Sequence, residues 1–364
     1  MTLTPELLAR IRSRAAAYDR DNSFFTDDLD ELRAAGYLAS RSLLKTARDQ
    51  RLLAAHAPAT ALGINMHLVW TGVARVLSER GDHSLDWVLD EAAQGELFAF
   101  GNSEPGNDLV LFDSLTKAET VDGGYAFTGT KIFTSLSPAW TRLGVFGRDG
   151  DRLVHGFLTR ETPGWHSLDD WDTLGQRATQ SHTTVLEGAV VPSDRVSRIL
   201  PVGPSADPFV FGIFANFLLL ISSVYAGIAD RALELSVEAA HRRTSLKNDG
   251  AAYSQDPDIR WRVADAALAV DALGPQIETL AADVDTLVDH GADWFRKLTG
   301  VKHRSTEAAR YVVDQAMRVG GGGAYRASSE LARLQRDVLA GIYHPSDTES
   351  VHSTVATNLL GPIV

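Results

Sequence analysis

His344 is the residue in the C-terminal part of the chain best suited by type to acid–base chemistry. It stands in the segment GIYHPSDTES, residues 341–350, directly before Pro345, which stops a helix. An imidazole titrates near neutral pH, so it can accept or donate a proton under ordinary conditions. The same position also suits a histidine that only interacts with the dipole at a helix end. The pattern therefore leaves a catalytic and a structural interpretation of His344.

Four short segments rich in glycine, hydroxyl and aromatic residues could together bind a cofactor. They are, in chain order, FGNSEPG at 100–106, GTKIFTS at 129–135, LGQRAT at 174–179 and GGGGAY at 320–325, the last followed by Arg336-Asp337. The chain has no P-loop, no GxGxxG after a strand, no GxSxG elbow and no HExxH pair. It also has no cysteine, which excludes disulfides, cysteine nucleophiles and thiolate metal sites. No metal site is expected.

In this order and spacing the four segments resemble the acyl-CoA dehydrogenase superfamily of flavoproteins, over nearly the whole chain. The family pattern runs aromatic-x-x-Thr-Glu-Pro-Gly, Gly-Thr-Lys-x-Trp-Ile-Thr, Leu-Gly-Met-Arg and Gly-Gly-x-Gly-Tyr, with Arg-Asp after it. The resemblance implies a flavin held between a strand-rich middle domain and a C-terminal helical bundle. It also implies which residues line the ring. These are Phe100, Asn102 and Ser103 on the pyrimidine side, with Phe133, Thr134 and Ser135 over the ring and near N5.

The resemblance further implies that the flavin is shared between subunits. Arg242 matches the family arginine that reaches the pyrophosphate of a neighbouring subunit's flavin. Gly321 and Gly322 match the turn whose backbone approaches the adenine part of that cofactor. The expected assembly is a homodimer or a homotetramer. Because Pro257 and Arg318 stand where the family has cofactor-contacting glutamines, FMN or a reduced flavin is an alternative to FAD.

The residue at the catalytic position departs from the dehydrogenase pattern. In acyl-CoA dehydrogenases a glutamate follows Ile-Tyr and removes a proton from the thioester, whereas here His344 follows Ile342-Tyr343. The glutamate that some members carry on the long helix after the β domain has no counterpart either. A second branch of the superfamily, the flavin-dependent monooxygenases, has Gly-Gly-x-Ala-x-Tyr-Arg-x-Ser, then Arg-Asp, then a histidine near the flavin. Residues 320–344 resemble that branch more closely.

The presence of motifs from both branches leaves three possible functions. The first is α,β-dehydrogenation of an acyl-CoA or similar acyl substrate by FAD, with His344 as the base and an electron-transferring flavoprotein as the electron acceptor. The second is a monooxygenase acting on an aromatic or other small substrate, with reduced flavin supplied by a separate flavin reductase. The third is a flavin-binding homologue without activity. The Ser-Glu-Pro-Gly segment favours the first function and the C-terminal segment favours the second.

The helix and strand signals along the chain predict an α+β protein with three domains. Residues 1–96 read as helices, with Thr4-Pro5 and Thr26 at helix starts. Residues 97–202 show short alternating segments separated by turn pairs, which predicts an antiparallel β-sandwich or barrel. Residues 203–364 return to long apolar-periodic helices, which predicts a four-helix bundle.

The composition of the chain bears on whether it binds nucleic acid or a membrane. The 364-residue chain carries a formal net charge of −12 with its Lys and Arg scattered, so nucleic acid is not an expected partner. The N-terminus lacks the apolar run of a signal peptide, so a cytoplasmic location is expected. One stretch between Asp207 and Asp230 is uncharged and long enough to cross a membrane. Its polar residues and acidic flanks favour a buried bundle helix instead, and no membrane contact is expected.

Overall fold

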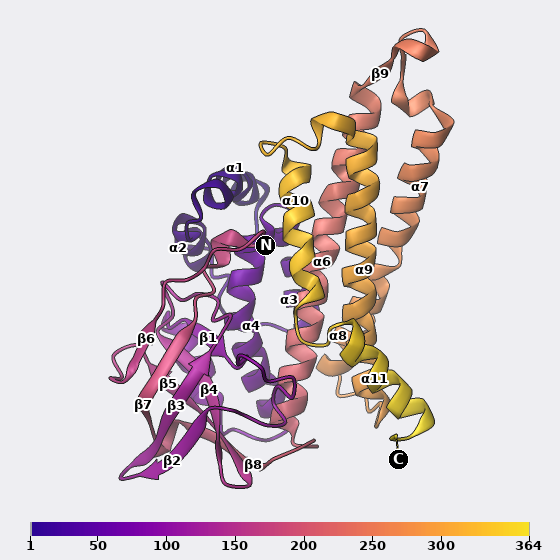
Figure 1. The fold of residues 1–364 in the computed structure, drawn as a ribbon. Coiled ribbons are helices and arrows are strands. Elements are labelled where there is room, and N and C mark those ends of the chain that lie inside the picture. Colours follow the sequence, from indigo (N-terminus) through magenta and orange to yellow (C-terminus); the bar gives the residue numbers. More distant parts are fainter. Residues whose placement is uncertain (1, 364) are drawn as a thin grey trace.

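The computed structural model describes residues 2–363 and has the α+β organisation expected from the sequence (Figure 1). The helices of the N-terminal part are α1 (Pro5–Asp21), α2 (Thr26–Ala34), α3 (Leu43–Ala54), α4 (Pro58–Ser78) and α5 (Asp86–Ala93). The Thr4 hydroxyl accepts a hydrogen bond from the Leu7 amide, and Pro5 takes the first helical position, so the predicted start of α1 is confirmed. Gly36 follows α2 at a φ of +70°, the left-handed conformation in which glycine commonly ends a helix.

The middle of the chain forms one eight-stranded sheet in the order β6-β7-β3-β2-β4-β5-β8, with β1 paired to β4. Its strands are β1 (Phe98–Gly101), β2 (Lys117–Val121), β3 (Gly124–Lys131), β4 (Arg142–Asp149), β5 (Arg152–Thr159), β6 (Trp165–Ser167), β7 (Thr184–Pro192) and β8 (Val196–Pro201). Most pairs are antiparallel, as expected, but β1 and β2 run parallel to β4. Local periodicity predicts strands and not their partners, and long connections permit parallel pairing.

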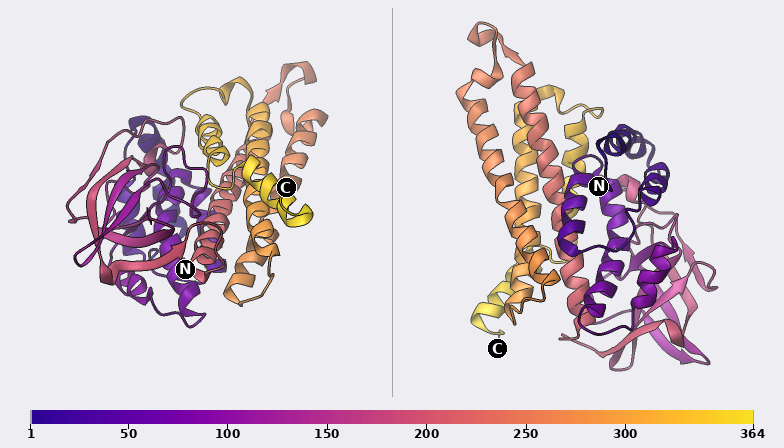
Figure 2. Two further views of the ribbon diagram at one scale, coloured as in Figure 1. Left: turned by 60° about the horizontal axis from the view of Figure 1, so that its bottom comes forward. Right: turned by 180° about the vertical axis from the view of Figure 1, so that it is seen from behind.

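The C-terminal part is a set of long helices. They are α6 (Pro208–Arg242), α7 (Pro257–Asp271), α8 (Leu273–Asp285), α9 (Asp293–Gly320), α10 (Glu330–Leu339) and α11 (Thr348–Leu360). A two-stranded ribbon of β9 (Thr244–Ser245) and β10 (Ala251–Ala252) joins α6 to α7. Both views in Figure 2 show these helices on one side of the molecule and the sheet on the other.

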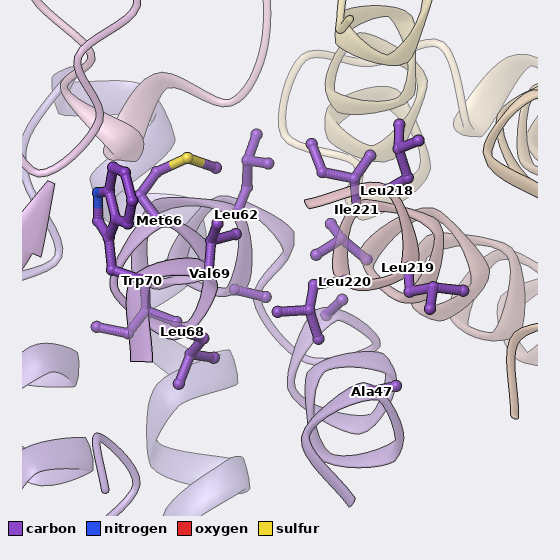
Figure 3. Packing of buried hydrophobic residues seen from close by; sticks show 14 of the residues in the cluster. Ala47, Leu62, Met66, Leu68, Val69, Trp70, Leu218, Leu219, Leu220 and Ile221 are labelled. Atoms are coloured by element: carbon purple, nitrogen blue, oxygen red, sulfur yellow. The ribbon is translucent and has the colours of Figure 1, made fainter. Parts of the chain in front are cut away.

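Helix α6 lies at the centre of the molecule and contacts α3 and α4 on one side and α9 on the other. Within residues 2–363 it is the one helix long and apolar enough to cross a membrane, yet 83% of its most apolar window is buried. Figure 3 shows Leu220 on the side of α6 that faces Val69 of α4, while Leu219 points to the other side of the helix. The uncharged stretch is therefore a core helix of the bundle, as the sequence predicted.

A junction between the β domain and α10 fixes the helix that leads to His344. A Cβ on Gly175 would lie 2.3 Å from the carbonyl oxygen of Arg336, so only glycine allows this approach. The Gln176 amide donates to Asp337 Oδ1 at 2.6 Å, and Arg336 is paired with Asp19 of α1. Loop 174–180 and α10 are thereby held together before the chain turns toward His344.

Candidate functional site

His344 lies at the end of the chain segment that continues α10. A 3-10 turn at Ala340–Ile342 extends the helix, and His344 follows it with a half-buried side chain. Its Nδ1 is 3.1 Å from the hydroxyl of Tyr225 on α6, and the two ring centres are 5.8 Å apart. The turn can sit this close to Tyr225 because residue 341 is glycine, where a Cβ would lie 2.9 Å from the tyrosine ring.

The electrostatic environment keeps the His344 imidazole neutral. Burial, with a smaller effect of the positive charge of Lys302, lowers the pKa of His344 to about 3. Burial also raises the pKa of Tyr225 well above its ordinary value, so its hydroxyl keeps its proton. When the protonated phenol donates to an unprotonated Nδ1, the ring proton lies on Nε2. In that tautomer the imidazole offers an N–H donor at Nε2, and its lowered pKa makes it a weak base at neutral pH.

The residues predicted to line the pyrimidine side lie at the end of β1. Phe100 packs between Trp70 of α4 and Phe217 of α6, with ring centres 5.0 and 6.0 Å away. Asn102 is buried, and its Nδ2 has no hydrogen-bond partner in the described part of the chain. Ser103 is half-buried, and its carbonyl accepts from the Ile132 amide at 2.9 Å. A buried unpartnered amide nitrogen costs free energy unless a ligand atom accepts from it.

Phe133 combines an unusual backbone conformation with an exposed side chain. It follows β3 with a φ of +60°, the left-handed region that a phenylalanine rarely adopts. Although it is a large apolar residue, 55% of it is exposed, and its main aromatic neighbour is Trp171, edge-on at 6.2 Å. A strained and exposed aromatic of this kind can cover one face of a planar group.

Hydroxyl groups close to Phe133 in the sequence form a series of hydrogen bonds. The Ser135 hydroxyl is 2.7 Å from that of Ser181, which donates to Thr179 at 2.8 Å. The Thr134 hydroxyl accepts from Thr184 at 3.1 Å. Ser135 and Thr134 are both buried. Ser135 is therefore held at the end of a connected polar network, as a group at the polar edge of a ring would need.

A buried ion pair links the segment after β1 to the end of β3. Lys131 donates to Glu104 Oε1 at 2.6 Å and to the Phe146 carbonyl at 2.7 Å, and both charged side chains are almost fully buried. Burial alone would favour a neutral carboxyl, but Lys131 and hydrogen bonds from Ser114 and Thr116 lower the pKa of Glu104 to about 2. The Ser-Glu-Pro-Gly and Gly-Thr-Lys segments are thus joined through their charged residues, which places Asn102 and Phe133 in one region.

These features fit a flat tricyclic flavin ring. Such a ring needs an apolar cover, donors at its pyrimidine edge and a hydroxyl near its N5 edge. Phe133 can provide the cover, Asn102 Nδ2 a free donor and Ser135 the hydroxyl. The residues of the β domain therefore agree with the cofactor that the sequence resemblance implied.

The residues predicted to reach a neighbouring flavin lie at the far ends of two helices. Arg242 is exposed at the last turn of α6, and Gly321, with a φ of +62°, begins the turn after α9. It is Arg243, and not Arg242, that packs against Gly321, donates to the Val319 carbonyl and lies over the Tyr253 ring at 4.4 Å. Nothing would obstruct a Cβ at Gly322. The glycine turn and the α6 terminus thus lie side by side.

Helix α6 connects the two halves of the predicted ring site. Phe217 contacts Phe100 from the β domain, and Tyr225 contacts His344. The two α6 residues are separated by about 12 Å of helix rise. Within residues 2–363, no hydrogen bond or ring contact joins His344 directly to Phe133, Asn102 or Ser135. A surface hollow of about 410 Å³, lined by residues such as Leu3, Arg12 and His56, includes none of these residues.

Two residues beside His344 lie outside the recognisable motifs. Tyr225 is one of the polar residues within the apolar stretch after Asp207, and Lys302 belongs to none of the four segments. Lys302 could have been found, because it shares the buried face of α9 with Leu298 and Ser305. A lysine on the buried face of a helix is unusual unless it has a specific partner.

The chain is similar to known flavoproteins along its whole length. A family model described as "Acyl-CoA dehydrogenase, C-terminal domain" matches residues 219–346, which include Tyr225 and His344. YdbM of Bacillus subtilis (strain 168), whose name assigns it to the acyl-CoA dehydrogenases, is 27% identical over 94% of this chain and 92% of its own. L-evernosamine nitrososynthase of Micromonospora sp. is 27% identical over 92% of this chain and 83% of its own.

Solved structures of similar proteins have the same fold as this chain. KijD3 in complex with dTDP superposes with a TM-score of 0.83 at 25% identity, over 98% of this chain and 95% of its own. Butyryl-CoA dehydrogenase from Megasphaera elsdenii has the same fold, with a TM-score of 0.85 at 18% identity over 98% of this chain and 99% of its own. The chain therefore belongs to the acyl-CoA dehydrogenase superfamily of flavin-dependent oxidoreductases.

Proposed function

We propose that this protein is a monooxygenase that uses reduced flavin delivered by a separate flavin reductase. The observation that carries the proposal is the state of His344. Its Nδ1 is occupied by the Tyr225 hydroxyl, and the pKa of the imidazole is lowered to about 3 by burial and by Lys302. Such a group is a poor base for removing a substrate proton but a good hydrogen-bond donor. The chemistry available is therefore that of the monooxygenase branch.

The residues would divide the work as follows. Phe133 and Asn102 bind and orient the ring, and Ser135 contacts its edge. Bound reduced flavin would supply the two electrons with which one oxygen atom of O2 enters the substrate and the other leaves as water. His344 would donate from Nε2 to an oxygen that develops negative charge, as a fixed dipole that stabilises this charge. Tyr225 keeps the proton on Nε2 throughout.

FMN is the proposed form of the flavin. Contacts to an adenine part are the weakest part of the family resemblance, because Pro257 and Arg318 replace the expected glutamines and Arg243 already occupies the space beside Gly321. KijD3, with the same fold, has been solved in complex with FMN and an amino-deoxysugar nucleotide. Its complexes and the nitrososynthase relative support a small polar substrate, oxidised at a heteroatom or carbon, in place of an acyl thioester.

The predicted homo-oligomer remains part of the proposal. Large apolar side chains are exposed on the C-terminal helices and the turn between α9 and α10, among them Trp261, Leu268 and Tyr325 at 73, 70 and 86% exposure. Exposed apolar groups of this size are typical of a surface that a subunit covers. With Arg242 exposed at the end of α6, such a contact would let an arginine of one subunit reach the flavin phosphate of its partner.

The second candidate is acyl-CoA dehydrogenation, which the similarity to YdbM and the Ser-Glu-Pro-Gly segment favour. The test that separates the two begins with protein loaded with oxidised flavin and mixed with acyl-CoA of several chain lengths without oxygen. The proposal expects no bleaching of the flavin. Bleaching by any acyl-CoA would overturn it and establish the dehydrogenase.

The complementary measurement starts from reduced FMN. The proposal expects the protein to bind it and to slow the release of hydrogen peroxide in air, relative to free reduced FMN. His344→Ala should remove this effect. If peroxide forms at the same rate with wild type, with His344→Ala and with no protein, the chain is the flavin-binding homologue without activity.

A further inference from the structure

Lys302 forms three hydrogen bonds to the backbone of the turn that contains His344. It lies in the middle of α9 with only 2% of its surface exposed. Its Nζ donates to the carbonyl oxygens of Gly341, His344 and Ser346, each at 3.0 Å. An ammonium group has three N–H donors, and all three are used on this one turn.

The partners of Lys302 are unusual for a buried lysine. A buried ammonium is costly unless it is fully hydrogen-bonded, and buried lysines normally pair with a carboxylate. Within residues 2–363 Lys302 forms no salt bridge, and Asp347 and Glu307 influence it only over longer distances. Every direct partner is a backbone carbonyl between positions 341 and 346. The ammonium group of Lys302 therefore stabilises the backbone conformation of that turn.

We infer that Lys302 is the residue that positions His344 for its reaction. This inference rests on the proposed role of the imidazole as an N–H donor. The ammonium holds the backbone of His344 through its own carbonyl, and Tyr225 holds the ring through Nδ1. The two contacts act on opposite ends of one residue, so together they leave a single direction for Nε2–H.

The charge of Lys302 has a second consequence. It adds to burial in lowering the pKa of His344, so the same group that fixes the backbone also keeps the ring neutral. Other charged and titratable groups near the ammonium are Asp347 and Glu307, which raise its pKa, and His303, whose pKa is lowered by burial and to a lesser degree by Lys302. Both effects on His344 are lost if the ammonium is removed.

The test compares amide hydrogen exchange in the full-length protein and in Lys302→Met, followed by peptide mass spectrometry. We expect amides of residues 341–347 to exchange at least ~10-fold faster in the variant, because local opening is then easier. Peptides from α6, such as 212–222, should be unchanged. Lys297→Met, on the same helix, is the matched control and should resemble wild type. Unchanged protection of 341–347 in Lys302→Met, or equal acceleration across the chain, would refute the inference.

Two further measurements keep the test decisive. If Lys302→Met does not fold, Lys302→Gln retains two N–H donors without charge and should give an intermediate rate. In wild type, burial lowers the pKa of Lys302 to about 8. Above that pH a neutral amine has two N–H groups, so protection of 341–347 should fall more than the general rise of exchange with pH. A constant relative protection from pH 7 to 9.5 would refute the inference without any variant.

Activity separates this inference from the proposed function. If the turn loosens in Lys302→Met and peroxide release from bound reduced FMN rises by up to ~10²-fold, both stand, since small misplacements of a reacting group have effects of that size. If the turn loosens and peroxide release does not change, Lys302 positions His344 but the imidazole has no role in oxygen chemistry.

Discussion

The hydroxyl of Tyr225 lies 3.1 Å from Nδ1 of His344, although 119 residues separate them in the chain. Tyr225 is fully buried in the middle of α6, and His344 follows the helix that the β domain holds in place through Gln176. The contact therefore joins the core helix of the bundle to the one residue expected to take part in chemistry. If the phenol donates in this contact, it favours the Nε2–H form of the imidazole.

Replacing Tyr225 by phenylalanine tests this selection. The ring remains, so the core should lose about 1 kcal/mol, the usual value of one hydrogen bond. His344 then loses its fixed proton position, and peroxide release from bound reduced FMN should rise about tenfold, equivalent to roughly 1.4 kcal/mol. Stopped-flow absorbance with a peroxide assay measures it. Tyr311→Phe, which removes a hydroxyl bonded to Asp265 on the outer face of the bundle, should leave the rate unchanged. Equal rates in both variants would contradict the assignment.

Replacing Asn102 by alanine should affect flavin binding and apoprotein stability in different directions. The Nδ2 of Asn102 is buried without a partner, so removing it takes away an unsatisfied group and should not destabilise the flavin-free protein. If the flavin accepts from this nitrogen, FMN affinity should fall about tenfold. Thermal melting without flavin and fluorescence titration with FMN measure the two effects. Asn248→Ala, at an exposed position, serves as the control. Unchanged affinity would place the pyrimidine edge elsewhere.

Breaking the Glu104–Lys131 ion pair should lower the stability of the fold and weaken the junction between the segments that contain Asn102 and Phe133. Each side chain is buried, so Lys131→Met leaves the Glu104 carboxylate without its cation and should cost about 3–5 kcal/mol in the free energy of unfolding. The double change Glu104→Leu with Lys131→Met removes both charges and should recover part of that loss. Urea unfolding of the three proteins measures the coupling. If the double variant is no more stable than the single one, hydrogen bonds from Ser114 and Thr116 to Glu104, and not the pair, stabilise the junction.

Local sequence signals predicted the elements well because caps and alternation act over a few residues. Thr4-Pro5 marks the observed start of α1, and the uncharged stretch after Asp207 is the buried α6. The pairing of β1 with β4 was not predictable in this way, because strand partners depend on the closure of the whole sheet. The contact of Arg243 with Gly321 was not predictable either, since the rotation of a helix end is set by tertiary packing.

The site was predictable only where it consists of contiguous motifs. Phe133, Asn102 and Ser135 stand within short segments that could be recognised one at a time. The state of His344 depends instead on Tyr225 and Lys302, which come from two other helices and contact it only after folding. The residue type favours a base because imidazole titrates near pH 7, whereas burial, with a smaller effect of Lys302, lowers the pKa of His344 to about 3 and disfavours that role.

His155 gives a prediction for stability in acid. It is fully buried on β5 between Phe146 and Phe209, and its Nε2 has no hydrogen-bond partner in the described residues. Burial, with smaller effects of Lys131 and Arg198, lowers its pKa to about 3. Between its ordinary pKa of about 6.5 and that value, the unfolded chain binds a proton that the folded protein does not. The contribution of the neutral ring to stability is thus complete above pH ~6.5 and is lost progressively as the pH falls toward 3.

His155→Phe should remove this dependence, since phenylalanine fits a site already lined by aromatic rings. Urea unfolding at steps from pH 7.5 to 4.5 should give free-energy differences between variant and wild type that grow in favour of the variant below pH 6.5, by roughly 1 kcal/mol per pH unit. His67 and His344, whose pKa values are also lowered by burial, are present in both proteins and cancel in the difference. His241→Phe, at an exposed position on α6, should follow wild type. Parallel curves for His155→Phe and wild type would mean that the ring takes up a proton in the folded state, and that the core around Phe146 is open to water.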